Sequence, residues 1–155
     1  MRGVRLGTLL VAAGLAVMAM PAVAAQGFDD PAAFVRERFA YYERGQVPQS
    51  WPDESYSPRL ARLFERLDAA EGGEERIGFD WWINAQDFEL GAVAVVIERS
   101  RGDRRTILAR WRNFGRADSS RFLFVRRRGR WFLDDVVSAT AGWRLSALLR
   151  EAARR

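Results

Sequence analysis

Cysteine, histidine and lysine are all absent from this chain of 155 residues. Without cysteine, the chain has no disulfides, thiolate nucleophiles, iron–sulfur clusters or lipid-modified N-terminus. Without histidine, it lacks the commonest general base near neutral pH and the commonest ligand of zinc and copper, so we expect no metal site. Without lysine, Schiff-base and Ser-Lys chemistry are excluded. These absences favour a protein that is not an enzyme, and they predict no cofactor and no catalytic residue.

The positive charge is carried by 25 arginines, against 20 carboxylates. Two of these arginines precede residue 6, so the chain from residue 25 onward has 23 arginines and a net charge of only +3. So small an excess does not indicate a nucleic-acid partner. Arginines nevertheless cluster at 99–105 and at 126–130. A solvated hairpin end explains the second cluster, although contact with anionic lipid or cell-wall phosphate is an alternative.

The N-terminus has the pattern of an export signal. Arg2 and Arg5 are followed by an apolar stretch over 6–20, by Pro21, and by the A-x-A cleavage pattern at 22–24. We therefore expect residues 1–24 to be a cleaved signal peptide and residues 25–155 to form one domain, periplasmic or secreted. An uncleaved anchor is the alternative, because 6–25 has about the ~20 residues that a spanning helix needs. After cleavage we expect no stable membrane insertion.

Three stretches carry helix signals. Asp30 and Pro31 suit the start of a helix that Gly45 ends, which predicts a helix over 30–44. Ser57 and Pro58 begin a second one, whose apolar face holds Leu60, Leu63, Phe64 and Leu67. The third predicted helix covers 142–153. Between the second and third, residues 77–90 keep neither helical nor strand period, and we expect them to be irregular.

Four strands are predicted after residue 90, over 92–99, 105–114, 121–127 and 131–137, with turns at 100–103, 115–118 and 128–129. Short connections of this kind give an antiparallel meander. The fold class that follows is α+β, with N-terminal helices and a C-terminal helix packed on a curved antiparallel sheet of about four strands.

Several stretches of the chain carry a resemblance to a known family. They are Tyr56 to Leu60, Asp80 with Asn84-Ala85-Gln86-Asp87, Asn113-Phe114-Gly115, Arg130 to Val136, Gly142 to Leu145, and Leu148-Leu149. Over about 30–150 the chain resembles the secreted bacterial domain-of-unknown-function family 3828, which is similar to the cone-shaped nuclear-transport-factor-2-like and SnoaL-like folds. The resemblance implies export and an apolar pocket inside a conical sheet. SnoaL-like enzymes use His or Asp there as acid or base, and this chain has no His.

The candidate site is therefore a set of polar and aromatic residues expected to line that pocket. Carboxylates among aromatic rings can have raised pKa values and serve as acid or base. Asn84 and Asp87 have a simpler explanation, since Asn and Asp commonly satisfy backbone groups in irregular segments. Only one of Asp134 and Asp135 should point inward, as a structural ion pair with Arg110 or Arg112. The pocket candidates are Asp80, Trp81, Asn84, Gln86, Asp87, Trp111 and Asp134.

Three functions remain open at this point. The first is an exported binding or interaction domain with a small apolar pocket. The second is a SnoaL-like small-molecule enzyme with an Asp acid/base. The third is an envelope immunity or inhibitor protein, which would need an exposed aromatic patch, for example around Trp51 and Tyr56. The partner is accordingly a small apolar ligand or an envelope protein.

Overall fold

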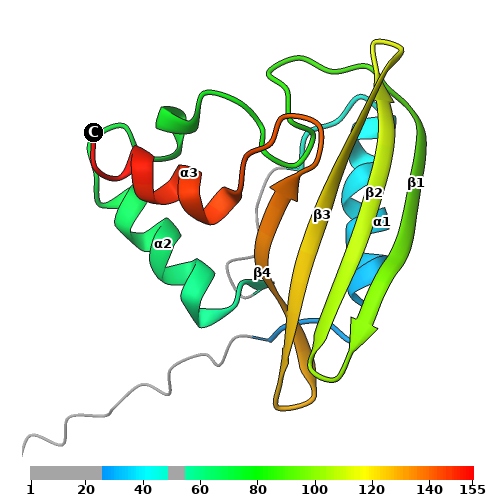
Figure 1. The fold of residues 1–155 in the computed structure, drawn as a ribbon. Helices are drawn as coiled ribbons and strands as arrows, with labels where there is room; N and C mark the ends of the chain where they lie inside the picture. Colours follow the sequence, from blue (N-terminus) through cyan, green and yellow to red (C-terminus); the bar gives the residue numbers. More distant parts are fainter. Residues whose placement is uncertain (1–25, 49–54) are drawn as a thin grey trace, which may run out of the picture.

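The computed structural model describes residues 26–48 and 55–155. Their helices and strands confirm the α+β class and the antiparallel sheet (Figure 1). None of the helices in these two ranges is long and apolar enough to cross a membrane. In chain order the elements are α1 (Pro31–Glu43), α2 (Pro58–Asp68), the 3-10 helix η2 (Gly73–Ile77), β1 (Leu90–Arg101), β2 (Arg104–Asn113), β3 (Arg116–Arg127), β4 (Arg130–Ser138) and α3 (Leu145–Ala152).

The first two helices begin where the sequence signals predict. The Asp30 side chain accepts a hydrogen bond from Ala32 N at 2.8 Å and caps α1. Ser57 Oγ accepts from Leu60 N at 3.2 Å and caps α2. In both helices proline occupies the first turn, where its missing N–H leaves no internal hydrogen bond unmade.

The four strands pair in the order β1-β2-β3-β4. The predicted start of β3 at 121 is wrong, because the strand already begins at Arg116. Phe114 and Gly115 both adopt positive φ, 47° and 76°, and together make the turn. The turn therefore needs two residues rather than four, and residues 116–120 continue the pairing with β2.

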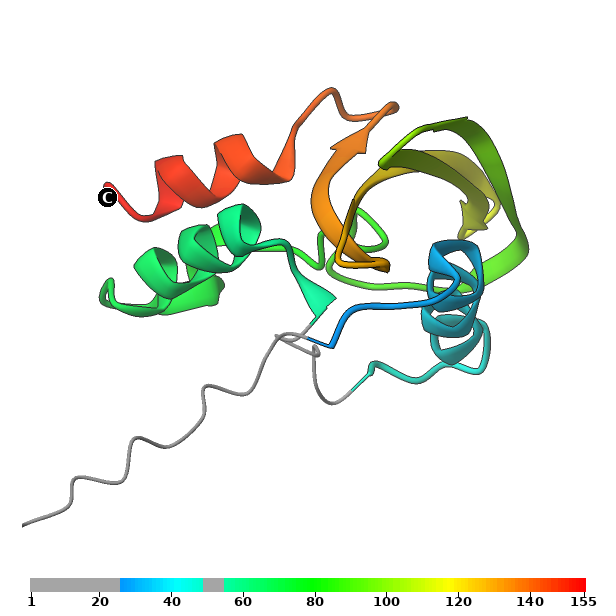
Figure 2. The same cartoon turned by 90° about the horizontal axis from the view of Figure 1, so that it is seen from below.

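The sheet curls, and the helices divide between two places. Figure 2 shows α1 lying across the open side of the curled sheet, while α2 and α3 lie side by side next to β4. Phe34 and Phe39 of α1 lie against rings of β2 and β3, and α1 also contacts β1. Helix α2 packs against α3. The predicted third helix is shorter than expected, since Gly142 has a positive φ of 74° and Arg144 pairs with Val137 in extended conformation.

Candidate functional site

The seven pocket candidates do not gather around one cavity. Asp80, Trp81 and Asn84 belong to a loop that two backbone hydrogen bonds between Asp80 and Ala85 close, at 2.9 and 3.3 Å. The other four candidates lie elsewhere: Gln86 and Asp87 in the exposed chain after the loop, Trp111 in β2, and Asp134 in β4.

The carboxylate of Asp80 has two donors within the loop and α1. Tyr42 Oη donates to Asp80 Oδ2 at 2.6 Å, and Trp82 N donates to Asp80 Oδ1 at 2.9 Å. Burial raises the pKa of Asp80 above its usual range, although these two hydrogen bonds act in the opposite direction. Burial, with the nearby Asp80 charge, also raises the pKa of Tyr42. Of the two carboxylates in this segment, Asp80 is thus the one that burial affects, and Tyr42 is the partner that sequence reasoning missed.

The raised pKa of Asp80 predicts a pH dependence of stability. Because the folded protein holds this proton more tightly than the unfolded chain, the contribution of Asp80 to the free energy of unfolding should fall as pH rises from the ordinary value near 3.8 through the raised value. Asp80→Asn removes this titration but keeps an oxygen for Trp82 N. Urea unfolding from acid to neutral pH should show wild type losing stability relative to Asp80→Asn. If the stability of wild type relative to Asp80→Asn stayed constant or increased as the pH rises, a carboxylate destabilised by burial at Asp80 would be contradicted.

Asn84 ties three elements together through its side chain. Trp143 Nε1 donates to Asn84 Oδ1 at 2.6 Å, and Asn84 Nδ2 donates to Asp118 Oδ2 at 3.1 Å. The expectation that Asn84 satisfies backbone groups with its side chain is therefore wrong. Its positive φ of 57° is a conformation that asparagine tolerates better than most residues, so backbone and side chain both favour asparagine here. This network holds the loop against β3 and the segment before α3.

Gln86 and Asp87 are exposed. Gln86 Nε2 donates to Gly78 O at 2.5 Å. Asp87 contributes its backbone oxygen, which accepts from Asn113 Nδ2 at 3.1 Å, while its carboxylate has no hydrogen-bond partner among the described residues. The expectation that the Asp87 side chain caps the irregular segment is therefore wrong, and the capping role belongs to Asp80.

Trp81 and Trp111 are packed into the interior. The Trp81 ring stacks on Trp82 with 5.2 Å between ring centroids, and Trp111 lies 5.0 Å from Phe39. Trp111 is 2% exposed, and its indole N–H has no acceptor among the described residues. It also borders a cavity of about 310 Å³ near Asp118 and Thr140. Among the described residues, rings thus fill the space between α1 and the curled sheet.

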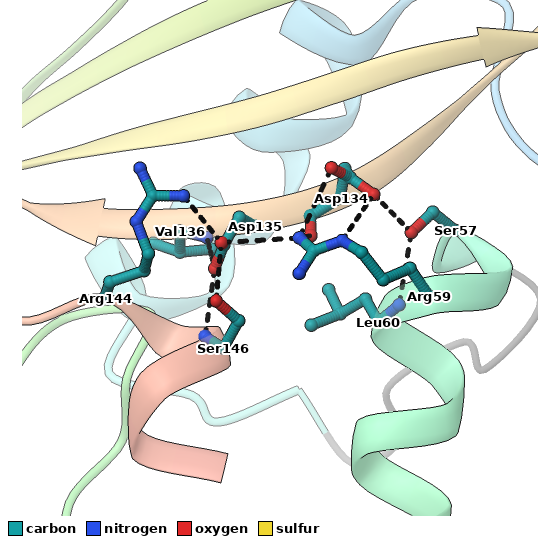
Figure 3. A network of polar contacts seen from close by, with 8 residues as sticks. All are labelled: Ser57, Arg59, Leu60, Asp134, Asp135, Val136, Arg144 and Ser146. Atoms are coloured by element: carbon teal, nitrogen blue, oxygen red, sulfur yellow. Dashed lines mark hydrogen bonds and ion pairs between the residues drawn. The ribbon is translucent and has the colours of Figure 1, made fainter. Parts of the chain in front are cut away.

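Asp134 and Asp135 lie in a polar network between β4, α2 and α3, shown in Figure 3. Strict alternation of side chains fails here, because Leu123 pairs with Asp135 and Phe124 pairs with Leu133, which leaves Asp134 as the extra residue of a bulge. Both carboxylates consequently face Arg59, whose Nη2 lies 3.3 Å from Asp134 Oδ2 and 3.4 Å from Asp135 Oδ2.

The expectation of an ion pair with Arg110 or Arg112 is wrong, since Asp135 pairs with Arg144 at 2.9 Å and with Arg59. Asp135 is buried, and its oxygens also accept from Ser146 N at 3.0 Å and from Ser146 Oγ at 2.8 Å. Arg144, at the cap position of α3, makes no side-chain capping bond. Asp135 therefore caps α3 from β4, the strand that directly precedes this helix in the chain.

A groove of about 1110 Å³ lies beside α1. None of the seven candidates lines it. Aromatic rings and both signs of charge contribute to its wall, in which Asp29 also pairs with Arg130. The lining residues are Gln26, Gly27, Phe28, Asp29, Asp30, Ala33, Phe34, Glu37, Arg38, Tyr41, Gln46, Val47, Pro48, Ser55 and Arg130.

Two residues of the groove show why its wall has this shape. Gly27 has a φ of 59°, and a Cβ there would lie 2.8 Å from Trp131 O and from the Phe132 ring, so the chain passes β4 too closely for a side chain. Arg38 is 9% exposed, its guanidinium lies 5.6 Å from the Phe34 ring centroid, and burial lowers its pKa. Sequence reasoning did not identify Arg38 as a groove residue, because the groove is built from chain segments that only folding brings together.

The exposed aromatic patch expected around Trp51 and Tyr56 does not include Tyr56. Tyr56 is 4% exposed and stacks on Phe64 at 4.8 Å, so it is not part of an exposed patch, and Trp51 lies outside the described residues. Across 26–48 and 55–155, no group of three or more acidic, histidine or cysteine side chains is placed to hold a metal ion.

Comparisons give no relative to set beside this geometry: the chain matches no family model, no curated protein and no solved structure. The resemblance to family 3828 and to the nuclear-transport-factor-2-like cone stays a prediction. Function must accordingly be argued from the groove and the buried polar groups.

Proposed function

We propose that this protein is an exported interaction domain that binds a segment of another envelope protein in the groove beside α1. The single observation that carries the proposal is the mixed lining of this groove. Its volume of about 1110 Å³ lies near the upper end of the roughly 300–1,000 Å³ of small-molecule sites, so the chemistry of the wall decides which kind of ligand fits.

The chemistry of the lining favours a polypeptide over a small apolar ligand. Asp29, Asp30 and Glu37 contribute negative charge, whereas Arg38 and Arg130 contribute positive charge. An apolar molecule would take these groups out of water without replacing their hydrogen bonds, which is costly. A polypeptide segment offers backbone donors and acceptors and charged side chains of both signs. Phe28, Phe34 and Tyr41 supply flat apolar contacts in the same groove.

The alternative is a SnoaL-like enzyme with an Asp acid/base, and Asp80 is its best candidate because burial raises its pKa. A general acid or base must come within hydrogen-bond reach of a substrate atom. The Asp80 carboxylate already accepts from Tyr42 and Trp82, and it lines neither of the two cavities described above. The binding role is therefore the better supported of the two.

Site-specific photo-crosslinking tests the proposal in cells that express the full chain. A photoreactive phenylalanine analogue at Tyr41 should give a discrete adduct with an envelope protein, on a chain whose N-terminus lies near Ala25. Adding Glu37→Arg should reduce this adduct about tenfold, since the reversal replaces an attractive charge by a repulsive one. Thermal unfolding of Glu37→Arg should match wild type.

Position 65 supplies the matched control, because Glu65 is an exposed glutamate on α2, away from the groove. The analogue placed there should give no adduct, and Glu65→Arg should leave the Tyr41 adduct unchanged. Equal adducts at positions 41 and 65, or an adduct that ignores Glu37, would overturn the groove as the binding site. An intact Met1 on the crosslinked chain would overturn cleavage of the signal.

A further inference from the structure

The two arginine clusters of the sequence meet at one end of the sheet. The turn between β1 and β2 and the turn between β3 and β4 lie side by side at the lower end in Figure 1. Arg126 N, near the end of β3, donates to Asp103 O in the turn between β1 and β2 at 2.7 Å. We call this surface the arginine end of the sheet; it consists of Arg99, Arg101, Arg104, Arg105, Arg126, Arg127, Arg128 and Arg130.

The arginine end makes the charge of the domain strongly asymmetric. Within 99–105 and 126–130 Asp103 is the only carboxylate. Taking these eight arginines and Asp103 out of the 23 arginines and 20 carboxylates after residue 24 leaves 15 arginines against 19 carboxylates. One end of the domain is therefore strongly positive, while the remainder is net negative. The small net charge of the whole chain conceals this.

Several of these guanidinium groups have no carboxylate partner. Arg105 and Arg126 lie against the Trp131 ring, at 4.5 and 5.8 Å from its centroid, and Arg130 pairs with Asp29. The nearby Glu98 is held by Arg121 at 2.8 Å. The remaining members form no ion pair with any described residue: Arg99, Arg101, Arg104, Arg127 and Arg128. They are exposed and available to phosphate oxygens.

The chain also enters the domain at this end. Phe28 pairs with Trp131 through two backbone hydrogen bonds of 2.8 Å, and Arg130 Nε donates to Gln26 O at 2.9 Å. The apolar stretch 6–20, which precedes Gln26 in the sequence, has the composition of a segment that meets a membrane during export. A domain that leaves the membrane through residue 26 would present its arginine end to the lipid headgroups.

We propose that the arginine end of the sheet docks the domain on a surface of anionic phospholipid headgroups. Guanidinium groups on two rigid hairpin turns can bind phosphate oxygens bidentately, without insertion of any helix into the bilayer. The charge asymmetry orients the domain, because the net negative remainder is repelled by the same surface. This docking is independent of the groove, with which the arginine end shares only Arg130.

Vesicle sedimentation tests the docking with protein purified after expression of the full chain. Wild type should bind vesicles of phosphatidylcholine and phosphatidylglycerol far more tightly than vesicles of phosphatidylcholine alone, and salt should weaken the binding. Replacing Arg101, Arg104 and Arg127 by Gln should lower the partition coefficient about one hundredfold, or about fivefold for each charge. If the triple variant fails to fold, each single variant should show about a fivefold loss.

The matched control replaces Arg62, Arg66 and Arg116 by Gln, which removes the same charge from exposed sites away from the arginine end. This variant should keep its affinity within about threefold. Equal losses in the two triple variants, or equal binding to both vesicle types, would overturn the proposal. Inorganic polyphosphate that binds as tightly as the phosphatidylglycerol vesicles would overturn the assignment to lipid. None of these outcomes affects the Tyr41 crosslink, which tests the groove.

Discussion

Asp135→Ala should lower the free energy of unfolding by about 3 kcal/mol, measured by urea unfolding at neutral pH. The substitution leaves Ser146 N, Ser146 Oγ and Val136 N without an acceptor in a buried place, and each stranded donor costs about 1–3 kcal/mol before relaxation. The two ion pairs add less, because Arg59 and Arg144 are 39% and 54% exposed in their side chains. Most of the effect should therefore come from the lost cap of α3 and the stranded donors.

Three further variants provide stabilities with which Asp135→Ala can be compared. Asp135→Asn keeps one acceptor oxygen and should cost about half as much as Asp135→Ala. Asp134→Ala removes contacts of a half-buried carboxylate with Ser57 and Arg59 and should cost about 1 kcal/mol. Asp87→Ala, at an exposed carboxylate, should stay within about 0.5 kcal/mol of wild type. A loss at Asp135 no larger than the loss at Asp134 would show that the buried network does not hold α3.

Local signals were sufficient for most of the fold. Asp30 and Ser57 begin α1 and α2 because a cap acts on amides only two or three residues away. The Arg128-Gly129 turn was predictable for the same reason, since two positive φ values close a hairpin locally. The start of β3 was not, because residues 116–118 become a strand only by pairing with Trp111 and its neighbours. Such pairing is a property of the assembled sheet.

The candidate site also combines features that local sequence predicts with contacts that form only on folding. The sequence identified Asp80 as a carboxylate among aromatic rings, and in the structure burial raises its pKa. It could not identify Tyr42, 38 positions earlier, as the donor, because helix α1 meets the loop only after folding. The common orientation of Asp134 and Asp135 was missed because a bulge breaks side-chain alternation in β4. Side-chain periodicity predicts the face of a regular strand, but it does not predict where an extra residue is inserted.

Trp82 decides whether the curled sheet encloses a pocket. Its side chain is 0% exposed. Its ring lies 4.7 Å from Phe122, 5.7 Å from Phe34 and 6.5 Å from Phe39, measured between centroids. It thus occupies the space between α1 and the concave face of the sheet, where a conical fold of the SnoaL-like kind would bind an apolar molecule. A pocket there should appear only when this ring is removed.

Trp82→Ala should therefore lower the free energy of unfolding by about 3–5 kcal/mol, while Trp82→Phe, which loses fewer contacts, should cost less than half of that. Indole should raise the thermal unfolding midpoint of Trp82→Ala by several degrees, because a cavity lined by apolar rings binds an apolar ligand of the missing shape. Leu149→Ala, a buried position between α2 and α3, is the control: it should also destabilise the protein but leave too small a space for indole. Wild type should not respond to indole either. An equal response in wild type would mean that a pocket is already open between α1 and the sheet, and the small apolar ligand would then become the preferred partner over a polypeptide.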